Sequence, residues 1–338
     1  MNVREVRWEI LAALRFFLAW VVLCGHSEWF LLQGSPLAYF AQFGGTTAVL
    51  GFMLVSGFSI ASSLVRKPEG FYVRRFLRIY PVYLSAIIFA QIVAAQLGPR
   101  TVLPGHTFVA TGPLTTAGNV LLLQMFLCKA IAYDPVVWSL SIECFYYLLA
   151  PYFMRTTFWK LAVLMGISAV AYALPPHEAF GPVYAMILKF HPLRYLWSWL
   201  LGLLFYRSGK TILYIAGLAG GLVLVRLSVR DNSQLLCPLT YAGSVLIIAF
   251  SNRLVLPRIG VRIADWLGEI SYPLYVFHVP AQTVAFVVFG LRGYLSLAGV
   301  GLLASTAAYY AIDVFLKPRF ITPWVLAMRR PAPALQAP

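Results

Sequence analysis

Long apolar runs separated by short polar segments dominate this chain of 338 residues. We interpret ten of the runs as membrane spans, because a helix rises about 1.5 Å per residue and the hydrocarbon core is about 30 Å thick. They cover about residues 10–32, 46–65, 80–97, 136–153, 160–174, 192–206, 211–227, 235–250, 266–289 and 296–316. The apolar residues are continuous and do not alternate with polar ones, which excludes a transmembrane β-barrel. The pattern predicts an all-α, polytopic membrane protein with about ten transmembrane helices.

The segment from Asn119 to Ala132 is ambiguous, and it decides the topology. If it does not cross the membrane, most Lys and Arg residues fall on the side of the N-terminus. If it crosses, most of the later basic residues change to the outer side. The positive-inside rule therefore favours a re-entrant or interfacial segment near 119–132, with both termini cytoplasmic. We expect one transmembrane domain over residues 1–320, followed over 321–338 by a Pro/Ala-rich, disordered cytoplasmic tail.

The composition supports a membrane protein and removes other classes. Hydrophobic residues make up 61% of the chain and charged residues 11%, a balance that no soluble fold of this length tolerates. The formal net charge of +15 would suggest nucleic-acid binding in a soluble protein. Here positive-inside bias and contact with anionic membrane lipids explain the basic loops, so we expect no nucleic-acid partner. The four cysteines show neither disulfide nor metal-ligand spacing.

The first run carries two ionisable residues, Arg15 near one end and His26 well inside. They are eleven residues apart, which places both on one helical face, about 16 Å apart along the axis. Such side chains are costly in lipid, and together they indicate a functional site. Two plainer explanations stay open. Arg15 would serve as an anchor that snorkels to the headgroups, and His26 as a buried histidine that satisfies a neighbouring hydrogen bond.

A basic loop follows the second run, from Arg66 to Pro81. Arg74, Arg75 and Arg78 lie within five residues of one another. Guanidinium groups suit phosphates because they offer paired, permanently charged donors. The loop therefore indicates a phosphate-binding site, although positive-inside bias alone would also place basic residues there.

The strongest local motif is VWSLSIECFYY, residues 137–147. Its Glu143 lies a turn or so inside a predicted span, where a carboxylate has to be paired, hydrogen-bonded or protonated. It would be suited to accept a proton from His26 and to set the tautomer and orientation of the imidazole. The alternative is a carboxylate that only complements the positive end of a helix dipole.

Two further spans contain polar residues in their interiors. Near the C-terminus, Ser271, Tyr275 and His278 fall at i, i+4 and i+7, on one face of one helix. In the second run Ser56 precedes Gly57, which would equally serve close helix packing. A second intramembrane histidine strengthens the case for an internal polar site. The remaining histidines fall in outer loops and receive no functional assignment: His106, His177 and His191.

Taken together, the motifs resemble the membrane-bound acyltransferase 3 family of bacterial O-acyltransferases, over about residues 8 to 320. Five elements appear in the family's order. They are Arg15 with His26, Ser56-Gly57-Phe58, Arg75 and Arg78 followed by Ile79 and Pro81, the run from Trp138 to Glu143, and Gly268 through Ser271-Tyr272 to Tyr275 and His278. Each element alone is weak, whereas five in order are specific. The chain departs from the pattern at Asp313, where a glutamate is usual, and at Cys144, where a polar residue is common.

The resemblance implies transfer of an acyl group, most often acetyl, from cytoplasmic acyl-CoA to a hydroxyl of a cell-surface or exported glycan, a lipid-linked sugar or a similar acceptor. Acetyl-CoA would be a donor substrate, with no permanently bound cofactor or metal, and the protein would lie in the bacterial inner membrane. His26 would act as general base or carry the acyl group, and Glu143 would orient it. Four arginines would bind coenzyme A: Arg15, Arg74, Arg75 and Arg78. Supporting or substrate-contacting roles would fall to Ser56, Trp138, Ser139, Ser141, Ser271, Tyr275 and His278.

A second hypothesis is a secondary transporter or flippase of a glycan or small molecule, in which the intramembrane charges form a proton relay. Against it, the sequence shows no pair of broken helices, and the arginine loop suits an anionic cofactor. Consumption of acyl-CoA without a gradient distinguishes the two hypotheses, because a transporter would leave acyl-CoA intact. The sequence leaves the oligomeric state open.

Overall fold

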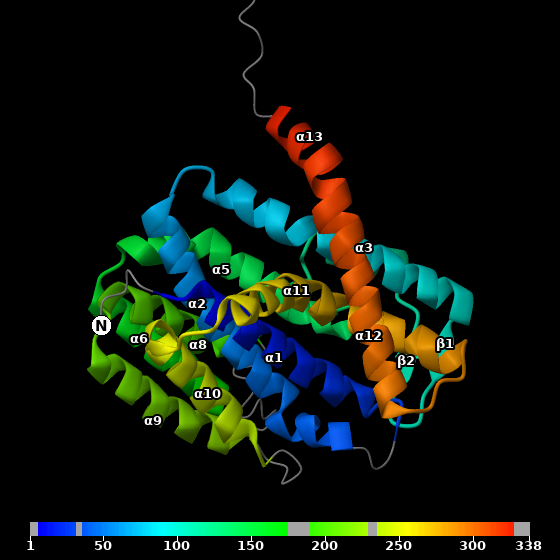
Figure 1. Ribbon diagram of the computed structural model, residues 1–338, viewed down its shortest axis with the longest axis horizontal. Helices are drawn as coiled ribbons and strands as arrows, with labels where there is room; N and C mark the ends of the chain where they lie inside the picture. The colour runs from blue at the N-terminus through cyan, green and yellow to red at the C-terminus, as the bar shows by residue number, and fades with distance from the viewer. Residues whose placement is uncertain (1–5, 32–35, 175–189, 229–234, 328–338) are drawn as a thin grey trace, which may run out of the picture.

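Ten long helices form the body of the computed structural model, which describes residues 6–31, 36–174, 190–228 and 235–327 (Figure 1). Each helix occupies one of the runs predicted from the hydrophobic pattern. They are α1 (Trp8–Ser27), α2 (Gly45–Arg66), α3 (Phe71–Leu97), α5 (Trp138–Arg155), α6 (Phe158–Ala173), α8 (His191–Ser208), α9 (Thr211–Ser228), α10 (Cys237–Phe250), α11 (Arg258–Val287) and α12 (Tyr294–Ala308).

Six helical stretches within the described ranges are both long and apolar enough to cross a membrane, and the protein is an all-α membrane protein. Six is fewer than the ten spans predicted. One reason is length, since α6 and α10 have 16 and 14 residues, below the roughly 20 that a span needs. Another is composition, since α11 is long but interrupts its apolar run with His278 and Gln282.

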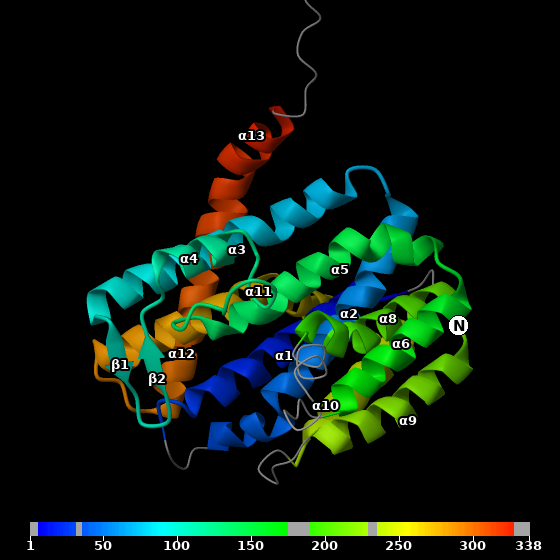
Figure 2. The ribbon, with the colours of Figure 1, turned by 180° about the vertical axis from the view of Figure 1, so that it is seen from behind.

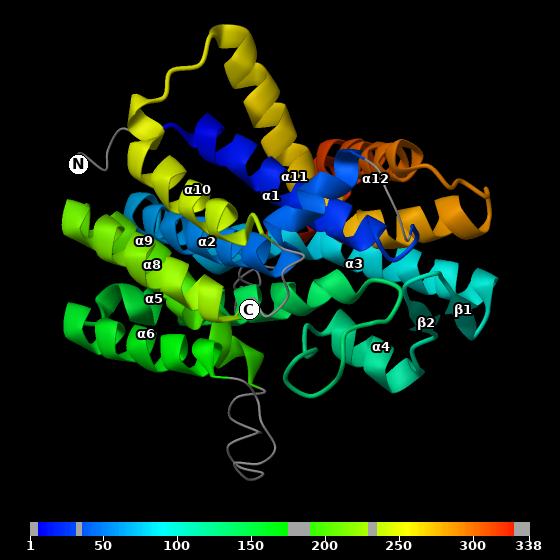
Figure 3. The same cartoon turned by 90° about the horizontal axis from the view of Figure 1, so that it is seen from below.

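Helices α2 and α8 pack with almost no space between their backbones (Figure 3). A Cβ atom on Gly57 would lie 1.9 Å from the carbonyl oxygen of Trp199, and one on Gly202 would lie 2.0 Å from that of Leu54. The two glycines therefore permit the close approach that small residues provide between membrane helices. This confirms the packing role that the sequence left open for Gly57.

Replacing Gly57 by alanine is therefore expected to destabilise the protein by about 1–3 kcal/mol, because the new methyl group meets backbone that cannot move aside. The thermal unfolding midpoint in detergent measures this loss. Gly243→Ala is the matched control, since nothing lies within 4 Å of a Cβ at that position. Equal unfolding midpoints for the two variants would contradict the close-packing explanation.

Helix α3 begins earlier than the sequence analysis expected. The segment treated as a loop from Arg66 to Pro81 is helical from Phe71 onwards, so Arg74, Arg75 and Arg78 lie on the first turns of α3. The turn between α2 and α3 is short and contains Gly70 at φ +65°, a left-handed conformation that glycine adopts without strain. The loop prediction is wrong because the helix extends beyond its apolar run and continues through Pro81.

The ambiguous segment 119–132 does not form a spanning helix. The short helix α4 (Pro113–Val120), which packs beside α3, ends at its start (Figure 2), and the residues beyond form a folded loop with positive φ at Leu122 and Met125. The Asn119 side chain closes this loop, since its amide donates to the carbonyl oxygens of Thr115 and Lys129, both at 2.8 Å. The structure thus agrees with a segment that does not cross as a helix.

Smaller elements lie between and beyond the long helices. Strands β1 (Arg100–Val102) and β2 (Thr107–Val109) form an antiparallel hairpin in which Thr101 is opposite Phe108. Three short 3₁₀ helices lie in the described chain: η2 (Pro36–Phe43), η3 (Pro135–Val137) and η5 (Ser251–Arg253). Helix α12 continues as the π-helix η6 (Tyr309–Ile321) and as α13 (Thr322–Ala327), which projects beyond the bundle (Figure 1). The helix thus runs past residue 321, where the tail was expected to begin, and residues 328–338 lie outside the described residues.

Candidate active site

A cavity of about 550 Å³ lies between α1, α2, α3, α5 and α11. Its wall contains five arginines and one lysine but a single carboxylate. The cationic lining residues are Arg15, Arg66, Lys67, Arg74, Arg75 and Arg78, and the remaining polar ones are Ser56, Ser59, Ser63, Ser139, Glu143, Tyr147, Ser271, Tyr272 and Tyr275. The fold therefore gathers most of the predicted site residues around one space.

Among the residues that the structure describes, the positive charges of the cavity lining outnumber the negative ones. Within the described ranges the ion pairs are Arg7–Glu9 and Lys317–Asp313, and neither involves a cavity residue. The Nε atoms of Arg15 and Arg75 are buried and have no hydrogen-bond partner. Guanidinium groups that lack acceptors favour an anionic ligand, with phosphate as the best geometric match.

The arginines Arg74, Arg75 and Arg78 in the α2–α3 region differ in their hydrogen-bond partners and in their exposure. The Arg74 guanidinium donates to the main-chain carbonyls of Lys67 and Glu69, so it stabilises the turn between the helices. Arg75 donates from Nη2 to the Ser63 hydroxyl at 2.9 Å and lines the cavity. Arg78 is exposed at the cavity wall. Of these three arginines, Arg75 and Arg78 are thus the two that remain available to a ligand.

Glu143 is held in the cavity wall by a directed chain of hydrogen bonds from three helices. Its carboxylate accepts from the Tyr147 hydroxyl at 2.6 Å. The Ser56 hydroxyl donates to that of Tyr147, and the Trp199 indole N–H donates to Ser56, both at 3.3 Å. Neither Tyr147 nor Trp199 was assigned a functional role from the sequence. The i+4 spacing of Tyr147 from Glu143 was a usable signal, whereas the Trp199 contact depends on how α8 packs.

His26 meets a second histidine and not Glu143. Its Nδ1 lies 2.9 Å from Nε2 of His278, and Nδ1 of His278 lies 2.8 Å from the carbonyl oxygen of Leu274. The predicted pairing of His26 with Glu143 is therefore wrong. The reason is helix packing: α1 runs along α11, which brings the two histidines together, whereas α5 contacts α2.

The histidine pair lies beyond the deep end of the cavity. The hydroxyls of Ser139 and Tyr275 lie 2.7 Å apart there, and the Phe52 ring packs edge-on against Tyr275 at 5.4 Å between centroids. These three residues line the cavity, whereas His26 and His278 are absent from its described lining. One helical turn of α11 separates Tyr275, which lines the cavity, from His278, so we place the Tyr275–Ser139 pair between the cationic cavity and the histidines.

On the opposite side, the β1–β2 hairpin covers the end of α1. The Trp29 ring lies 4.3 Å from the His26 ring, and the His106 ring stacks on Trp29 at 4.6 Å between centroids. The main-chain N–H of Gly105 donates to the carbonyl oxygen of Trp29 at 3.0 Å. Partial burial lowers the pKa of the His106 imidazole, which keeps the ring neutral near pH 7. His106 received no role from the sequence, because no local pattern links it to His26, which is eighty positions earlier.

A buried carboxyl group lies just before α5. Both oxygens of Asp134 are buried and have no hydrogen-bond partner in the described part of the chain. Burial raises the pKa of this carboxyl well above its ordinary value. Asp134 received no role from the sequence.

The other predicted site residues make packing contacts or hydrogen bonds within the fold. The Trp138 ring packs against Tyr195 at 5.1 Å and lies outside the cavity lining, while the Ser141 hydroxyl donates to the carbonyl oxygen of Gln124 at 2.7 Å and fixes the 119–132 loop. The Ser271 hydroxyl lines the cavity but donates to Gly268 of its own helix at 2.7 Å. His177 lies outside the described residues.

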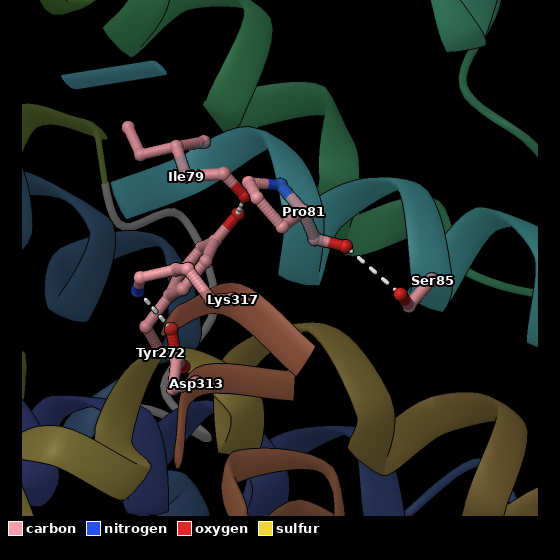
Figure 4. A network of polar contacts seen from close by, with 6 residues as sticks. All are labelled: Ile79, Pro81, Ser85, Tyr272, Asp313 and Lys317. Carbon is pink, nitrogen blue, oxygen red and sulfur yellow. Dashed lines mark hydrogen bonds and ion pairs between the residues drawn. The ribbon is translucent and has the colours of Figure 1, made fainter. Parts of the chain in front are cut away.

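A polar contact fixes α11 against α3 at the cavity wall. Figure 4 shows the Tyr272 hydroxyl donating to the carbonyl oxygen of Ile79 at 2.9 Å. The same view shows Asp313 paired with Lys317 on η6, so the charge of this carboxylate is satisfied within its own helix.

Comparison with known proteins agrees with the motifs. A family model described as an acyltransferase domain matches residues 8–314. A protein of Streptomyces mycarofaciens named acyltransferase MdmB is 30% identical over an alignment of 214 residues that covers 58% of this chain. The chain covers 53% of that relative, or about half its length. No solved structure matches the chain. Because the family model covers most of the chain, this protein belongs to the acyltransferase 3 family.

Proposed function

We propose that this protein is a bacterial inner-membrane O-acyltransferase. It moves an acyl group, acetyl in the simplest case, from cytoplasmic acyl-CoA to a hydroxyl of a glycan, a lipid-linked sugar or a similar acceptor. The observation that carries the proposal is the cationic cavity, whose lining residue Tyr275 lies one helical turn from His278 of the His26–His278 pair. Membership of the acyltransferase family supports acyl transfer as the reaction.

Coenzyme A, an anion with several phosphates, matches the positive charge of the cavity lining. Its phosphates lie at one end of a long, narrow and uncharged arm that ends in the thioester. Lys67, Arg75 and Arg78 lie where the cavity meets the α2–α3 turn, and they would hold the phosphates. The arm would then pass Glu143 and end near Tyr275, at the deep end of the cavity.

His26 is the base that the proposal requires. The acceptor hydroxyl gives its proton to the free ring nitrogen of His26, while its oxygen bonds to the thioester carbonyl carbon. The carbon–sulfur bond then breaks, and its electron pair leaves on sulfur. The thiolate takes up a proton, so the products are the ester and coenzyme A thiol. A positioned base contributes roughly 10²–10⁴-fold to such a step.

The Tyr275–Ser139 pair stands between donor and base. Because it closes the deep end of the cavity, Tyr275 has to turn aside for the acyl group to reach His26. Once released from Ser139, its hydroxyl would donate to the oxyanion that develops on the carbonyl.

Purified protein in detergent or vesicles tests the proposal. With an acyl-CoA donor and a polyol or glycan acceptor, coenzyme A thiol should appear in proportion to ester, without any ion gradient. Thiol release is followed with a thiol reagent and the ester by mass spectrometry. A protein that leaves every acyl-CoA intact, yet moves protons or a glycan across vesicles, would be the transporter of the alternative hypothesis.

A further inference from the structure

Two histidines from different helices share one hydrogen bond: His278 is buried, and His26 is half-buried. His26 contributes Nδ1 and His278 contributes Nε2, at 2.9 Å, and the rings are nearly parallel at 22°. The second nitrogen of His278 faces the Leu274 carbonyl oxygen at 2.8 Å. A carbonyl oxygen can only accept, so Nδ1 of His278 carries a proton.

These contacts fix the protons on both rings. His278 is fully buried, and no carboxylate of the described chain pairs with it, so the ring is neutral. A neutral imidazole carries one proton, which leaves Nε2 of His278 as an acceptor. Nδ1 of His26 must then donate to it. The remaining nitrogen of His26, Nε2, keeps its lone pair.

We propose that His278 is the positioning residue of the reaction, which holds His26 in the Nδ1–H tautomer and leaves Nε2 as the base. The inference rests on the proposed function and gives His278 the task that the sequence suggested for Glu143. In water a histidine side chain favours the proton on Nε2, so the contact with His278 selects the less populated form. In serine hydrolases a carboxylate does this by accepting from Nδ1–H, and here a neutral imidazole accepts instead.

The surrounding contacts hold this geometry from several sides. The Gln282 amide, one turn beyond His278, donates to the Ser27 hydroxyl at 2.7 Å and so fixes the residue next to His26. The Trp29 ring also packs against the His26 ring, at 4.3 Å between centroids. A Cβ on Gly301 would lie 3.5 Å from the Cβ of His278, so α12 packs closely against His278.

The tautomer is measurable without any substrate. The chain contains five histidines, so ¹⁵N-histidine labelling gives few enough signals to assign His26 by comparison with His26→Gln. In the wild type we expect a protonated Nδ1 and an unprotonated Nε2. In His278→Leu the proton should move to Nε2. A His26 that carries its proton on Nε2 in the wild type, or does not change in His278→Leu, would overturn the proposal.

Kinetic measurements distinguish a positioning role of His278 from a role in packing alone. His278→Leu should lower kcat at least roughly 100-fold and leave the KM for acyl-CoA within about twofold, because His278 is outside the donor cavity. His278→Gln should recover most of kcat, since its amide oxygen can accept from Nδ1–H. Thr283→Val is the control, because this buried hydroxyl on the same helix donates to the carbonyl oxygen of Val279 within its own helix.

The outcomes distinguish this proposal from the proposed function. Equal loss of kcat in the Leu and Gln variants, with an unchanged tautomer at His26, would show a merely structural role and overturn the proposal. A wild type that consumes no acyl-CoA would refute the acyltransferase function, and the ¹⁵N measurement would still report whether His278 sets the tautomer.

Discussion

Replacing His26 by alanine is expected to lower acyl transfer roughly 10²–10⁴-fold, because the acceptor hydroxyl loses the base that takes its proton. Acyl-CoA affinity should stay unchanged, since His26 lies beyond the Tyr275–Ser139 layer and does not line the cationic cavity. Ester formation at saturating donor and acceptor measures the first effect. Equilibrium binding of acyl-CoA to the purified variant measures the second.

The control for this experiment is His106→Ala. The His106 ring stacks on Trp29 and is not the hydrogen-bond partner that orients His26, so its loss should cost much less than tenfold. Chromatographic behaviour in detergent reports whether each variant is folded. A folded His26→Ala protein that turns over at the wild-type rate would remove His26 from the mechanism.

Replacing Arg75 or Arg78 by alanine is expected to weaken acyl-CoA binding about 10–100-fold, which corresponds to about 1.5–3 kcal/mol per charge-assisted hydrogen bond. Affinity for the acceptor should change little. The lysine variants should fall between alanine and arginine, because lysine keeps the charge but loses the paired donors. Binding at several salt concentrations should also show a larger salt effect for the exposed Arg78 than for the half-buried Arg75.

Arg155→Ala provides the matched control for these variants. Arg155 is a basic residue in the last turn of α5 and does not line the cavity, so its loss should leave donor affinity unchanged. Equal losses in all three alanine variants would show that general positive charge on this side, and not a phosphate site, determines binding. Arg74→Ala is a poor test, because Arg74 also holds the turn between α2 and α3.

The periodic and compositional signals predicted the fold well. Continuous apolar runs located all ten long helices of the described chain, because a backbone in lipid has to satisfy its hydrogen bonds within the helix. Helix boundaries were less accurate, as α3 shows. Its first turns carry arginines and contain no apolar run, yet they are helical because arginine is a good helix former and the short turn at Gly70 redirects the chain.

The sequence also identified most of the polar residues that line the cavity. Ionisable groups are rare inside spans, so Arg15, His26, Glu143 and His278 were each conspicuous. The sequence did not identify the hydrogen-bond partners of these groups. Glu143 was assigned to His26, but it bonds to Tyr147 and lies on the cavity side of the Tyr275–Ser139 layer. Trp199 and His106 carried no local signal at all.

The amino-acid sequence by itself determined that this is a helical membrane protein with an arginine-rich region and buried ionisable residues. These properties follow from hydrophobicity and charge along the chain, which are local. Only the tertiary structure decided that His26 pairs with His278 and that the arginines line one cavity. Those facts depend on which helix faces pack together, and packing faces are set by the shapes of side chains far apart in the chain.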